Sequence, residues 1–255
     1  MLSHEELQRY ARHIVLRDVG GPGQQTLTAA RVVVVGAGGL GSPILQYLAA
    51  AGIGTIGIVD DDTVALSNLQ RQIIHGTPDI GRPKVASARD AILRLNPHVT
   101  VEPHELRLDA ANAREILSGY DVVIDGTDNF ATRFLVADAC AALETPLVAA
   151  AVIEFYGWVT VLMPYATAPD GSRNPSLKAI MRQPDEGRAQ TCADVGILGV
   201  VAGILGTLAA AEALKLVLGL GTPLIRRMLA VDVRDMSFDS LDYAGEPAVA
   251  AADET

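Results

Sequence analysis

The chain has 255 residues, of which 30 are acidic and 20 basic, giving a formal net charge of −10. This length can bury a sizeable core, and the acidic balance argues against nucleic acid as a substrate. The two cysteines, Cys140 and Cys192, exclude a disulfide framework and fit a reducing cytoplasm. Because no basic stretch followed by an apolar core opens the chain, no signal peptide is expected and the predicted location is cytoplasmic.

The first segment is predicted to be helical. A capping box over residues 3–6 starts a helix that runs to about Asp18. Arg12 lies within this helix, where its spacing also suits an ordinary solvated helix face. The glycine-rich residues 20–23 are expected to break the helix ahead of the next strand.

Residues 31–60 read as strand, glycine turn, helix, strand and acid. Val32–Val35 is a β-branched run that leads into the turn, and Thr55–Val59 is a second strand that ends on Asp60. The turn contains four glycines, Gly36, Gly38, Gly39 and Gly41. Without Cβ atoms, backbone N–H groups can approach a phosphate at the positive end of the following helix, while Asp60 can accept hydrogen bonds from a ribose. The pattern favours a nucleotide site over a purely structural glycine turn.

The segment after Asp60 does not continue into another crossover, as that of a nicotinamide dehydrogenase would. It presents four polar side chains beside the expected nucleotide, Asn68, Gln70, Arg71 and Gln72. Arg71 can clamp phosphate oxygens as a planar fork. Lys84 opens the helix Val85–Leu95, where a cation opposes the helix dipole, and this mild penalty makes sense if an anion binds there.

A buried strand over Val122–Ile124 ends in an acidic turn that carries Asp128. Ligands of open α/β sheets bind at the carboxyl ends of the strands, so Asp128 lies on the expected active edge. Triphosphate chemistry needs a divalent ion held by a carboxylate, and Asp128 is the candidate ligand. The same position also suits the N-cap of the helix Phe130–Leu143, and spacing alone leaves both roles open.

The remaining chain alternates between strands, helices and one long irregular stretch. Further strands are expected at residues 99–102, 147–153, 159–163, 227–233 and 236–241, and a further helix at residues 110–118. Residues 164–190 show no such pattern, and a loop of this length is usually functional or disordered. Cys192 follows at the start of the next helix, where a thiol is readily activated as a nucleophile; a small buried residue is the alternative.

The segment Val195–Ala211 carries no charge and approaches the length of a membrane span, with Gly199 and Gly203 as a GxxxG pair. The segment has close to the minimum length for a helix that spans a bilayer, and the charged residues Glu212 and Lys215 follow it directly. We therefore expect a helix buried in a core or subunit interface, and no association with a membrane.

Six motifs spread over nearly the whole chain resemble the ThiF/MoeB/HesA family, the bacterial relatives of ubiquitin-activating enzymes. They are RYARHIVL at 9–16, VGAGGLGSP at 35–43, VDDDTVALSNLQRQIIH at 59–75, GRPKV at 81–85, DGTDNF at 125–130 and TCADVGILG at 191–199. SNLQRQ together with TDN is far more selective than the glycine turn.

The resemblance implies an α/β fold with a Rossmann-like mixed sheet, helices on both faces, and the adenylation architecture of ubiquitin-activating enzymes. The expected layout is a single adenylation domain over 1–243, with a helical arm at 1–29, a crossover loop at 164–191 and a disordered tail at 244–255.

The implied activity is ATP- and Mg²⁺-dependent adenylation of the C-terminal Gly-Gly carboxylate of a small ubiquitin-like sulfur carrier. Pyrophosphate is released, and the acyl-adenylate serves sulfur transfer in cofactor biosynthesis or tRNA thiolation. The resemblance also implies a homodimer. The fused sulfurtransferase domain of some relatives is not expected here, so sulfur would come from a separate sulfurtransferase or cysteine desulfurase.

The resemblance assigns nucleotide contacts residue by residue. Gly39 lines the phosphates, and Asp60 holds the ribose. Asn68, Arg71 and Lys84 stabilise the phosphate charge. The same motifs imply further contacts from Gly36, Gly38, Gly41, Asp62, Ser67, Leu69, Gln70, Gln72, Asp128 and Asn129.

Three more roles follow from the resemblance. Asp128 binds the Mg²⁺ ion. Arg12 matches an arginine that reaches across the homodimer interface into the partner's site, and Cys192 matches a cysteine implicated in thioester or acyl-disulfide chemistry. Positioning and electrostatic stabilisation supply most of such catalysis, so Cys192 ranks below the cations and Asp128 for the adenylation step.

One departure from the family concerns zinc. Many members carry two Cys-x-x-Cys pairs that bind a structural zinc, whereas this chain has Ser172–Lys178 in the first region and no cysteine near its C-terminal end. Two thiols cannot make a Cys₄ site, so no structural zinc is expected. A NAD-binding oxidoreductase and a non-catalytic nucleotide-binding scaffold are the alternative functions.

Overall fold

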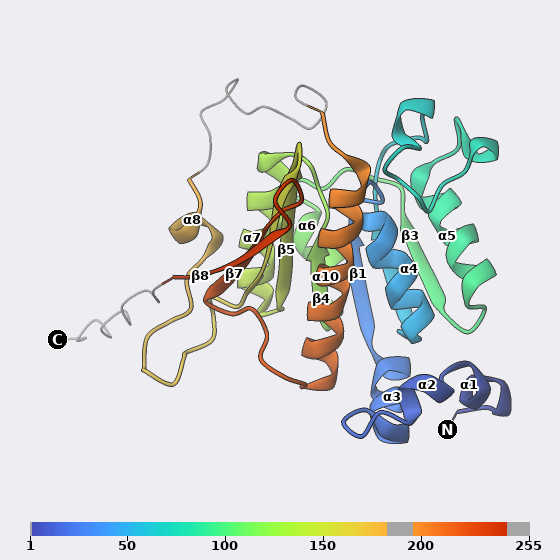
Figure 1. The fold of residues 1–255 in the computed structure, drawn as a ribbon, viewed down its shortest axis with the longest axis horizontal. Helices are drawn as coiled ribbons and strands as arrows, with labels where there is room; N and C mark the ends of the chain where they lie inside the picture. The colour runs from blue at the N-terminus through green and yellow to red at the C-terminus, as the bar shows by residue number, and fades with distance from the viewer. Residues whose placement is uncertain (1, 183–195, 244–255) are drawn as a thin grey trace.

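The computed structural model describes residues 2–182 and 196–243 and contains an eight-stranded sheet (Figure 1). The strands are β1 (Arg31–Val35), β2 (Thr55–Val59), β3 (Thr100–His104), β4 (Val122–Asp125), β5 (Leu147–Ile153), β6 (Tyr156–Leu162), β7 (Arg227–Asp232) and β8 (Ser237–Asp242). Their spatial order is β3-β2-β1-β4-β5-β6-β7-β8. Pairs from β3 through β5 are parallel, and pairs from β5 through β8 are antiparallel. The predicted mixed sheet is therefore confirmed.

Helices cover both faces of this sheet. They are α1 (His4–Arg9), α2 (Ala11–Ile14), α3 (Gly20–Ala29), α4 (Gly41–Ala51), α5 (Lys84–Leu95), α6 (Ala113–Leu117), α7 (Phe130–Leu143), α8 (Leu177–Ile180) and α10 (Gly199–Leu218). One hydrophobic cluster joins the sheet to α4, α5 and α10, and a second joins its other face to α6 and α7 (Figure 1). Val32 and Val34 belong to the first cluster and Val33 and Val35 to the second, because a central parallel strand is buried on both faces.

The chain reverses its path across the sheet between β1 and β4. It runs outward from β1 through β2 to β3, and then returns to β4 on the other side of β1. Such a switch point leaves a crevice at the carboxyl ends of the two strands. The turn after β1 carries the predicted glycines and the turn after β4 carries Asp128, so the fold brings both to one edge of the sheet.

The N-terminal arm differs from the expectation of one helix broken at residues 20–23. α1 and α2 are separate helices, and α3 begins in the glycine-rich stretch and includes Pro22. Proline is tolerated in a first helical turn because its missing N–H would have no partner there, so this stretch starts a helix instead of ending one. The break between α1 and α2 falls at Tyr10, whose buried ring packs against Gly52 and whose hydroxyl accepts a hydrogen bond from Asn96 Nδ2 at 2.8 Å.

Among the described residues, α10 alone is long and apolar enough to cross a membrane. It begins and ends a few residues later than predicted and packs against α4, β5 and β6. A Cβ on Gly206 would lie 2.5 Å from Pro43 Cγ and 2.6 Å from the Leu40 carbonyl oxygen, so glycine permits the close approach of α10 to α4. Gly203, by contrast, faces open space. These contacts support the expectation of a buried helix.

Polar contacts fasten residues 164–182, the described part of the predicted crossover loop. Arg226 Nη1 donates to Asp170 at 2.8 Å and so joins the loop to the segment ahead of β7. Lys178 on α8 pairs with Asp138 on α7 at 2.7 Å. Exposed ion pairs contribute little to stability, so these contacts locate the loop more than they stabilise the fold.

Replacing Gly206 by alanine forces a methyl group into the contact between α10 and α4. We expect the free energy of unfolding to fall by about 1–3 kcal/mol, the usual cost of overpacking a core. Gly203→Ala, on the same helix but facing open space, should instead gain roughly 0.5–1 kcal/mol from helix propensity. Urea unfolding followed by circular dichroism measures both changes. A neutral Gly206→Ala variant would show that the close approach of the two helices is not required.

Candidate nucleotide-binding site

A cavity of about 410 Å³ opens at the carboxyl ends of β1, β2 and β4. Most of the predicted nucleotide contacts line it: Gly36, Gly38, Gly39, Asp60, Asp62, Arg71, Gln72, Lys84, Asp128 and Asn129. The other predicted contacts lie outside its wall: Gly41, Ser67, Asn68, Leu69 and Gln70. The fold thus gathers the glycine turn, the acid after β2, two cations and the acidic turn after β4 around one space.

Two of the glycines are needed for the shape of the turn itself. Gly36 has a φ of +95°, and a Cβ there would lie 2.9 Å from the Gly126 carbonyl oxygen. A Cβ on Gly41 would lie 1.9 Å from the Gly36 carbonyl oxygen, so Gly41 shapes the turn from behind the cavity wall. No side chain caps the start of α4, and Ser42 N in its first turn donates to the Gly38 carbonyl at 2.9 Å. The backbone N–H groups of residues 38–41 have no hydrogen-bond partner among the described residues, which leaves them for an anion.

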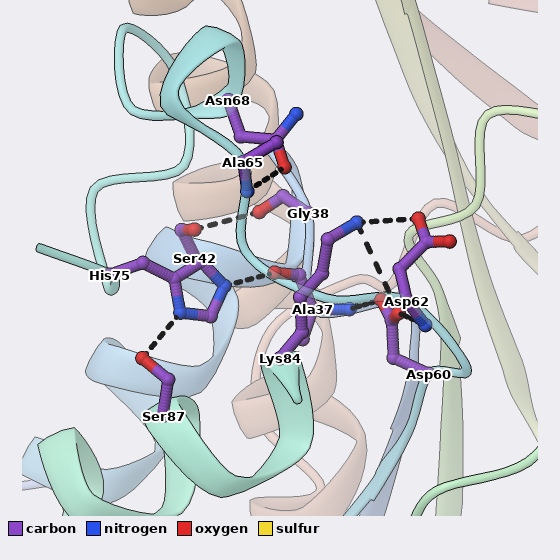
Figure 2. A network of polar contacts seen from close by, with 10 residues as sticks. All are labelled: Ala37, Gly38, Ser42, Asp60, Asp62, Ala65, Asn68, His75, Lys84 and Ser87. Atoms are coloured by element: carbon purple, nitrogen blue, oxygen red, sulfur yellow. Dashed lines mark hydrogen bonds and ion pairs between the residues drawn. The ribbon is translucent and has the colours of Figure 1, made fainter. Parts of the chain in front are cut away.

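Asp60 ties the glycine turn to the end of β2 (Figure 2). Its Oδ2 accepts a hydrogen bond from Ala37 N at 2.8 Å, and its Oδ1 accepts one from Asp62 N at 2.9 Å. Burial raises the pKa of this carboxyl, while the charge of Lys84, whose Nζ lies 4.0 Å away, opposes the rise. Each carboxylate oxygen keeps a further lone pair that a ribose hydroxyl can share.

His75 holds the same turn from the other side, although no sequence pattern singled it out. Its Nε2 lies 2.9 Å from the Ala37 carbonyl oxygen, which can only accept, so Nε2 carries the proton. Its Nδ1 lies 2.8 Å from Ser87 Oγ on α5 (Figure 2). Burial lowers the pKa of this imidazole, which favours the neutral ring. The one signal in the sequence is the place of His75 at the end of the 59–75 motif.

Two cations reach the cavity wall from different segments. The Lys84 side chain is 7% exposed, and its Nζ donates to Asp62 Oδ2 at 2.8 Å. Arg71 Nη1 donates to the Ser67 carbonyl at 3.0 Å. A guanidinium has five N–H donors, so this single bond leaves donors for a phosphate.

The residues just before Arg71 shape their loop instead of lining the cavity. The Asn68 side chain accepts a hydrogen bond from the backbone N–H three residues earlier, at 3.1 Å, and closes a short 3-10 turn. The Gln70 carbonyl lies against α10, where a Cβ on Gly199 would come within 2.3 Å of it. These contacts fix the loop that carries Arg71, and the direct nucleotide contact expected of residues 67–70 stays a prediction.

A buried ion pair that the sequence did not reveal supports the turn after β4. Arg133 Nε donates to Asp125 Oδ2 at 3.2 Å, and Arg133 Nη2 donates to the Thr127 carbonyl at 2.8 Å. Asp125 also accepts from the Thr127 N–H and hydroxyl, at 2.9 and 2.6 Å. The rings of Phe130 and Trp158 flank the guanidinium, with centroids 5.8 and 5.5 Å from Cζ. Arg133 therefore belongs to the framework of the cavity.

The turn that this pair supports presents Asp128 at the cavity. Asn129, and not Asp128, is the N-cap of α7, since its side chain accepts from Thr132 N at 2.8 Å. Asp128 is exposed and has no ion-pair partner within the described part of the chain. Its carboxylate oxygens, which have no ion-pair partner, could therefore hold a Mg²⁺ ion that is also bound by the phosphates of a substrate. Residues 2–182 and 196–243 contain no group of three or more metal-binding side chains, so such an ion would depend on those phosphates.

Two predicted catalytic residues are not placed at this cavity. Arg12 lies exposed on α2, in the arm that precedes β1, at the other end of the sheet (Figure 1). Cys192 lies outside the described residues. The other cysteine, Cys140, is buried in α7, and burial raises the pKa of its thiol to about 12, so it packs as a core residue.

The fold and the cavity define a nucleotide-binding protein of the Rossmann-like α/β class. Residues 10–248 match the ThiF family, and the chain belongs to this family. It is 46% identical over 246 residues to the probable adenylyltransferase/sulfurtransferase MoeZ of Mycobacterium tuberculosis. The matched region covers 96% of this chain and 62% of MoeZ. It therefore spans less than two thirds of the length of MoeZ.

Two other relatives match in length more closely. The SAMP-activating enzyme E1 of Haloferax volcanii is 45% identical over 96% of this chain and 88% of its own length. The sulfur carrier protein adenylyltransferase of Thermus thermophilus is 45% identical over 95% of this chain and 89% of its own length.

Solved structures support the fold. MccB of E. coli gives a TM-score of 0.81 at 20% identity, over 98% of this chain and 73% of that one. PaaA gives a TM-score of 0.75 at 24% identity, over 94% and 74% of the two chains. At these identities the likeness concerns the fold alone, and it agrees with the predicted Rossmann-like mixed sheet.

Because His75 binds protons less readily in the folded protein than in the unfolded chain, acid should weaken the fold through this residue. We expect its contribution to the free energy of unfolding to be complete above the ordinary histidine pKa, about 6.5, and to fall as the pH drops below it. His75→Gln, which keeps a donor for Ala37 but does not titrate, should flatten this dependence in urea unfolding between pH 8 and 5.5. His4→Gln, at an exposed imidazole without an ion-pair partner among the described residues, should keep it. An unchanged slope in the His75 variant would contradict the neutral buried ring.

Proposed function

We propose that the protein uses ATP to adenylate the C-terminal Gly-Gly carboxylate of a small ubiquitin-like sulfur carrier, with release of pyrophosphate, for sulfur transfer in cofactor biosynthesis or tRNA thiolation. The observation that carries the proposal is the convergence of Arg71, Lys84 and Asp128 on one cavity beside the glycine turn. The names of the relatives at 45–46% identity support the same activity. A nicotinamide oxidoreductase needs no metal-binding carboxylate at its dinucleotide, so Asp128 in particular favours adenylation.

The strand order gives the bound nucleotide a direction. Asp60, at the end of β2, takes the ribose, and the glycine turn at the end of the neighbouring β1 takes the phosphates. The phosphate chain then points across the turn toward β4, where Asp128 stands. Arg71 and Lys84 approach the same space from the segment after β2 and from the start of α5.

The reaction needs charge stabilisation more than proton transfer. A carboxylate oxygen of the carrier attacks the α-phosphorus and forms the acyl–O–phosphorus bond. The bond from the α-phosphorus to the oxygen it shares with the β-phosphate breaks, and its electron pair leaves with pyrophosphate. Arg71, Lys84 and the backbone N–H groups of the turn offset the negative charge that builds on these oxygens. Bound Mg²⁺, held by Asp128, would neutralise further phosphate charge.

The apolar wall of the cavity suits the carrier tail. Ile153, Tyr156 and Trp158 line the cavity on the side of the antiparallel strands, and the first two are partly exposed. A diglycine has no side chains, so it can extend along a narrow apolar path and bring its carboxylate to the α-phosphate.

Arg12 acts in the second subunit of a homodimer in this proposal. Its helix lies at the other end of the sheet from the cavity of its own chain (Figure 1). Val15 and Leu16 beside it are 74% and 53% exposed, and association would remove this apolar surface from water. The carrier receives its sulfur from a separate sulfurtransferase or cysteine desulfurase, in the cytoplasm, without a nucleic-acid or membrane partner.

Adenylation can be tested by pyrophosphate–ATP exchange with a carrier that ends in Gly-Gly, and by mass spectrometry of the acyl-adenylate. Asp128→Ala should lower the exchange rate by about 100-fold or more, because the charge on the leaving group loses its metal-bearing carboxylate. Asp138→Ala removes an acid from α7 far from the cavity wall and should exchange normally. Undiminished exchange in the Asp128 variant would remove the metal assignment, and tight NAD binding without any ATP-dependent reaction would remove the proposed function.

Mixed dimers test whether Arg12 acts across the interface. Arg12→Ala and Lys84→Ala should each be nearly inactive alone. A mixed dimer of the two contains one site with both residues intact, so random exchange of subunits should restore about a quarter of the wild-type rate. Lys84→Ala mixed with Asp128→Ala should restore nothing, because both residues serve their own chain. Failure of the first mixture to recover, under conditions where subunits exchange, would contradict action in trans.

A further inference from the structure

The two carboxylates that flank Lys84 are held in different ways (Figure 2). Asp60 has a side chain that is 9% exposed, and backbone N–H groups donate to both of its oxygens. Asp62 has a side chain that is 68% exposed. Within the described residues, the Asp62 carboxylate has one partner, Lys84 Nζ at 2.8 Å. One acid is therefore fixed by the backbone and the other only by the lysine.

Lys84 needs an anionic partner at all times. Its side chain is 7% exposed, and it opens α5, where the helix dipole disfavours a cation. A buried ammonium without a partner is costly, since it has lost its water and gained nothing in return. In this structure Asp62 supplies most of the compensating charge, because Asp60 lies 4.0 Å away and is already hydrogen-bonded elsewhere.

Exchange of this partner requires little movement. The backbone of residues 62–64 is bonded to residues 81–84: Lys84 N donates to the Asp62 carbonyl at 2.9 Å, Val64 N donates to the Arg82 carbonyl at 2.9 Å, and Gly81 N donates to the Val64 carbonyl at 2.8 Å. These bonds hold the main chain at both residues. Because the Asp62 carboxylate is largely in water, a rotation of its side chain is enough to release Lys84.

We propose that Asp62 is an exchangeable counter-ion that competes with the phosphates of the substrate and with pyrophosphate for Lys84, an inference that rests on the proposed function. A phosphate that binds Lys84 Nζ takes the place of the Asp62 carboxylate, because Asp60 already lies 4.0 Å from the ammonium and a third anion there would be repelled. Asp62 therefore weakens the binding of both ATP and pyrophosphate. When pyrophosphate leaves, Asp62 returns, so Lys84 is paired throughout the cycle and product release is easier.

The chain offers a matched control in the neighbouring residue. Asp61 lines the same cavity and is exposed, but it has no ion-pair partner within the described residues. Asp61→Asn and Asp62→Asn each remove one negative charge from the cavity, and only the second frees Lys84. The difference between the two variants separates the specific competition from the change in net charge.

Calorimetric titration with ATP and with inorganic pyrophosphate tests the proposal, first with EDTA present and then with Mg²⁺. Asp62→Asn should lower the Kd of both ligands by roughly three- to tenfold in EDTA, the size expected when a partly exposed ion pair no longer competes. Asp61→Asn should change either Kd by less than about twofold, because an exposed and unpaired charge is screened. Asp62→Glu restores the charge and should bind as the wild type does.

Two kinds of result would overturn the counter-ion role while leaving the adenylation proposal intact. The first is a wild type that binds ATP while Asp62→Asn binds no tighter than Asp61→Asn. The second is an Asp62→Asn variant that binds the ligands more weakly than the wild type. Weaker binding in EDTA would make Asp62 a residue that positions Lys84, whereas weaker binding only with Mg²⁺ would make it a metal ligand. A wild type that binds neither ligand under either condition would overturn both proposals.

Discussion

The hydrogen bond from the Ala37 N–H to the Asp60 carboxylate joins the two strand ends on which the site is built. β1 and β2 end side by side, and this bond holds the glycine turn of one against the acid of the other. His75 binds the carbonyl of Ala37, so the same residue is fixed on both sides by groups from later in the chain. A turn rich in glycine has high conformational freedom, and it can serve as a preorganised anion site only where such bonds remove that freedom.

The charged groups at the cavity fall into two kinds, distinguished by their partners. Arg133 is buried with Asp125, and its Nε and Nη2 donate to protein oxygens. Lys84 is about as buried, but its partner Asp62 is largely in water. A pair with both members buried cannot be broken without leaving a buried charge, whereas a pair with one member in water can be exchanged at lower cost. Presence at the cavity wall therefore does not by itself assign a cation to the substrate. In our proposal Lys84 is the cation that changes partner, because its carboxylate partner Asp62 is largely in water.

Sequence patterns predicted the elements that depend on neighbouring residues. A helix was predicted over Phe130–Leu143, and α7 begins and ends at these two residues. The glycine turn and the strands on either side of it also lie where they were predicted. The glycine-rich residues 20–23, which were expected to break a helix, begin α3 because Pro22 is acceptable in a first turn. Contacts between distant segments were not predicted from the sequence: the Gln70 carbonyl lies against α10 at Gly199, and whether residues 67–70 contact a nucleotide stays a prediction. His75 went unassigned since its partners lie on other elements, which periodicity cannot reveal.

The small residues of α10 are explained by their contacts with the site. Gly206 lets the helix lie on α4 at Pro43, and Gly199 lets its first turn touch the Gln70 carbonyl. Because α4 begins at the glycine turn and the Gln70 loop leads to Arg71, α10 contacts both the elements that hold the turn and the loop that carries Arg71, the turn and the cation that we propose to bind phosphate. A larger side chain at either glycine would move these two parts relative to each other, and the Coulombic stabilisation of phosphate charge falls with distance. The apolar, glycine-containing composition that is typical of a membrane span is thus also the composition that packs one helix closely against two parts of the candidate nucleotide site.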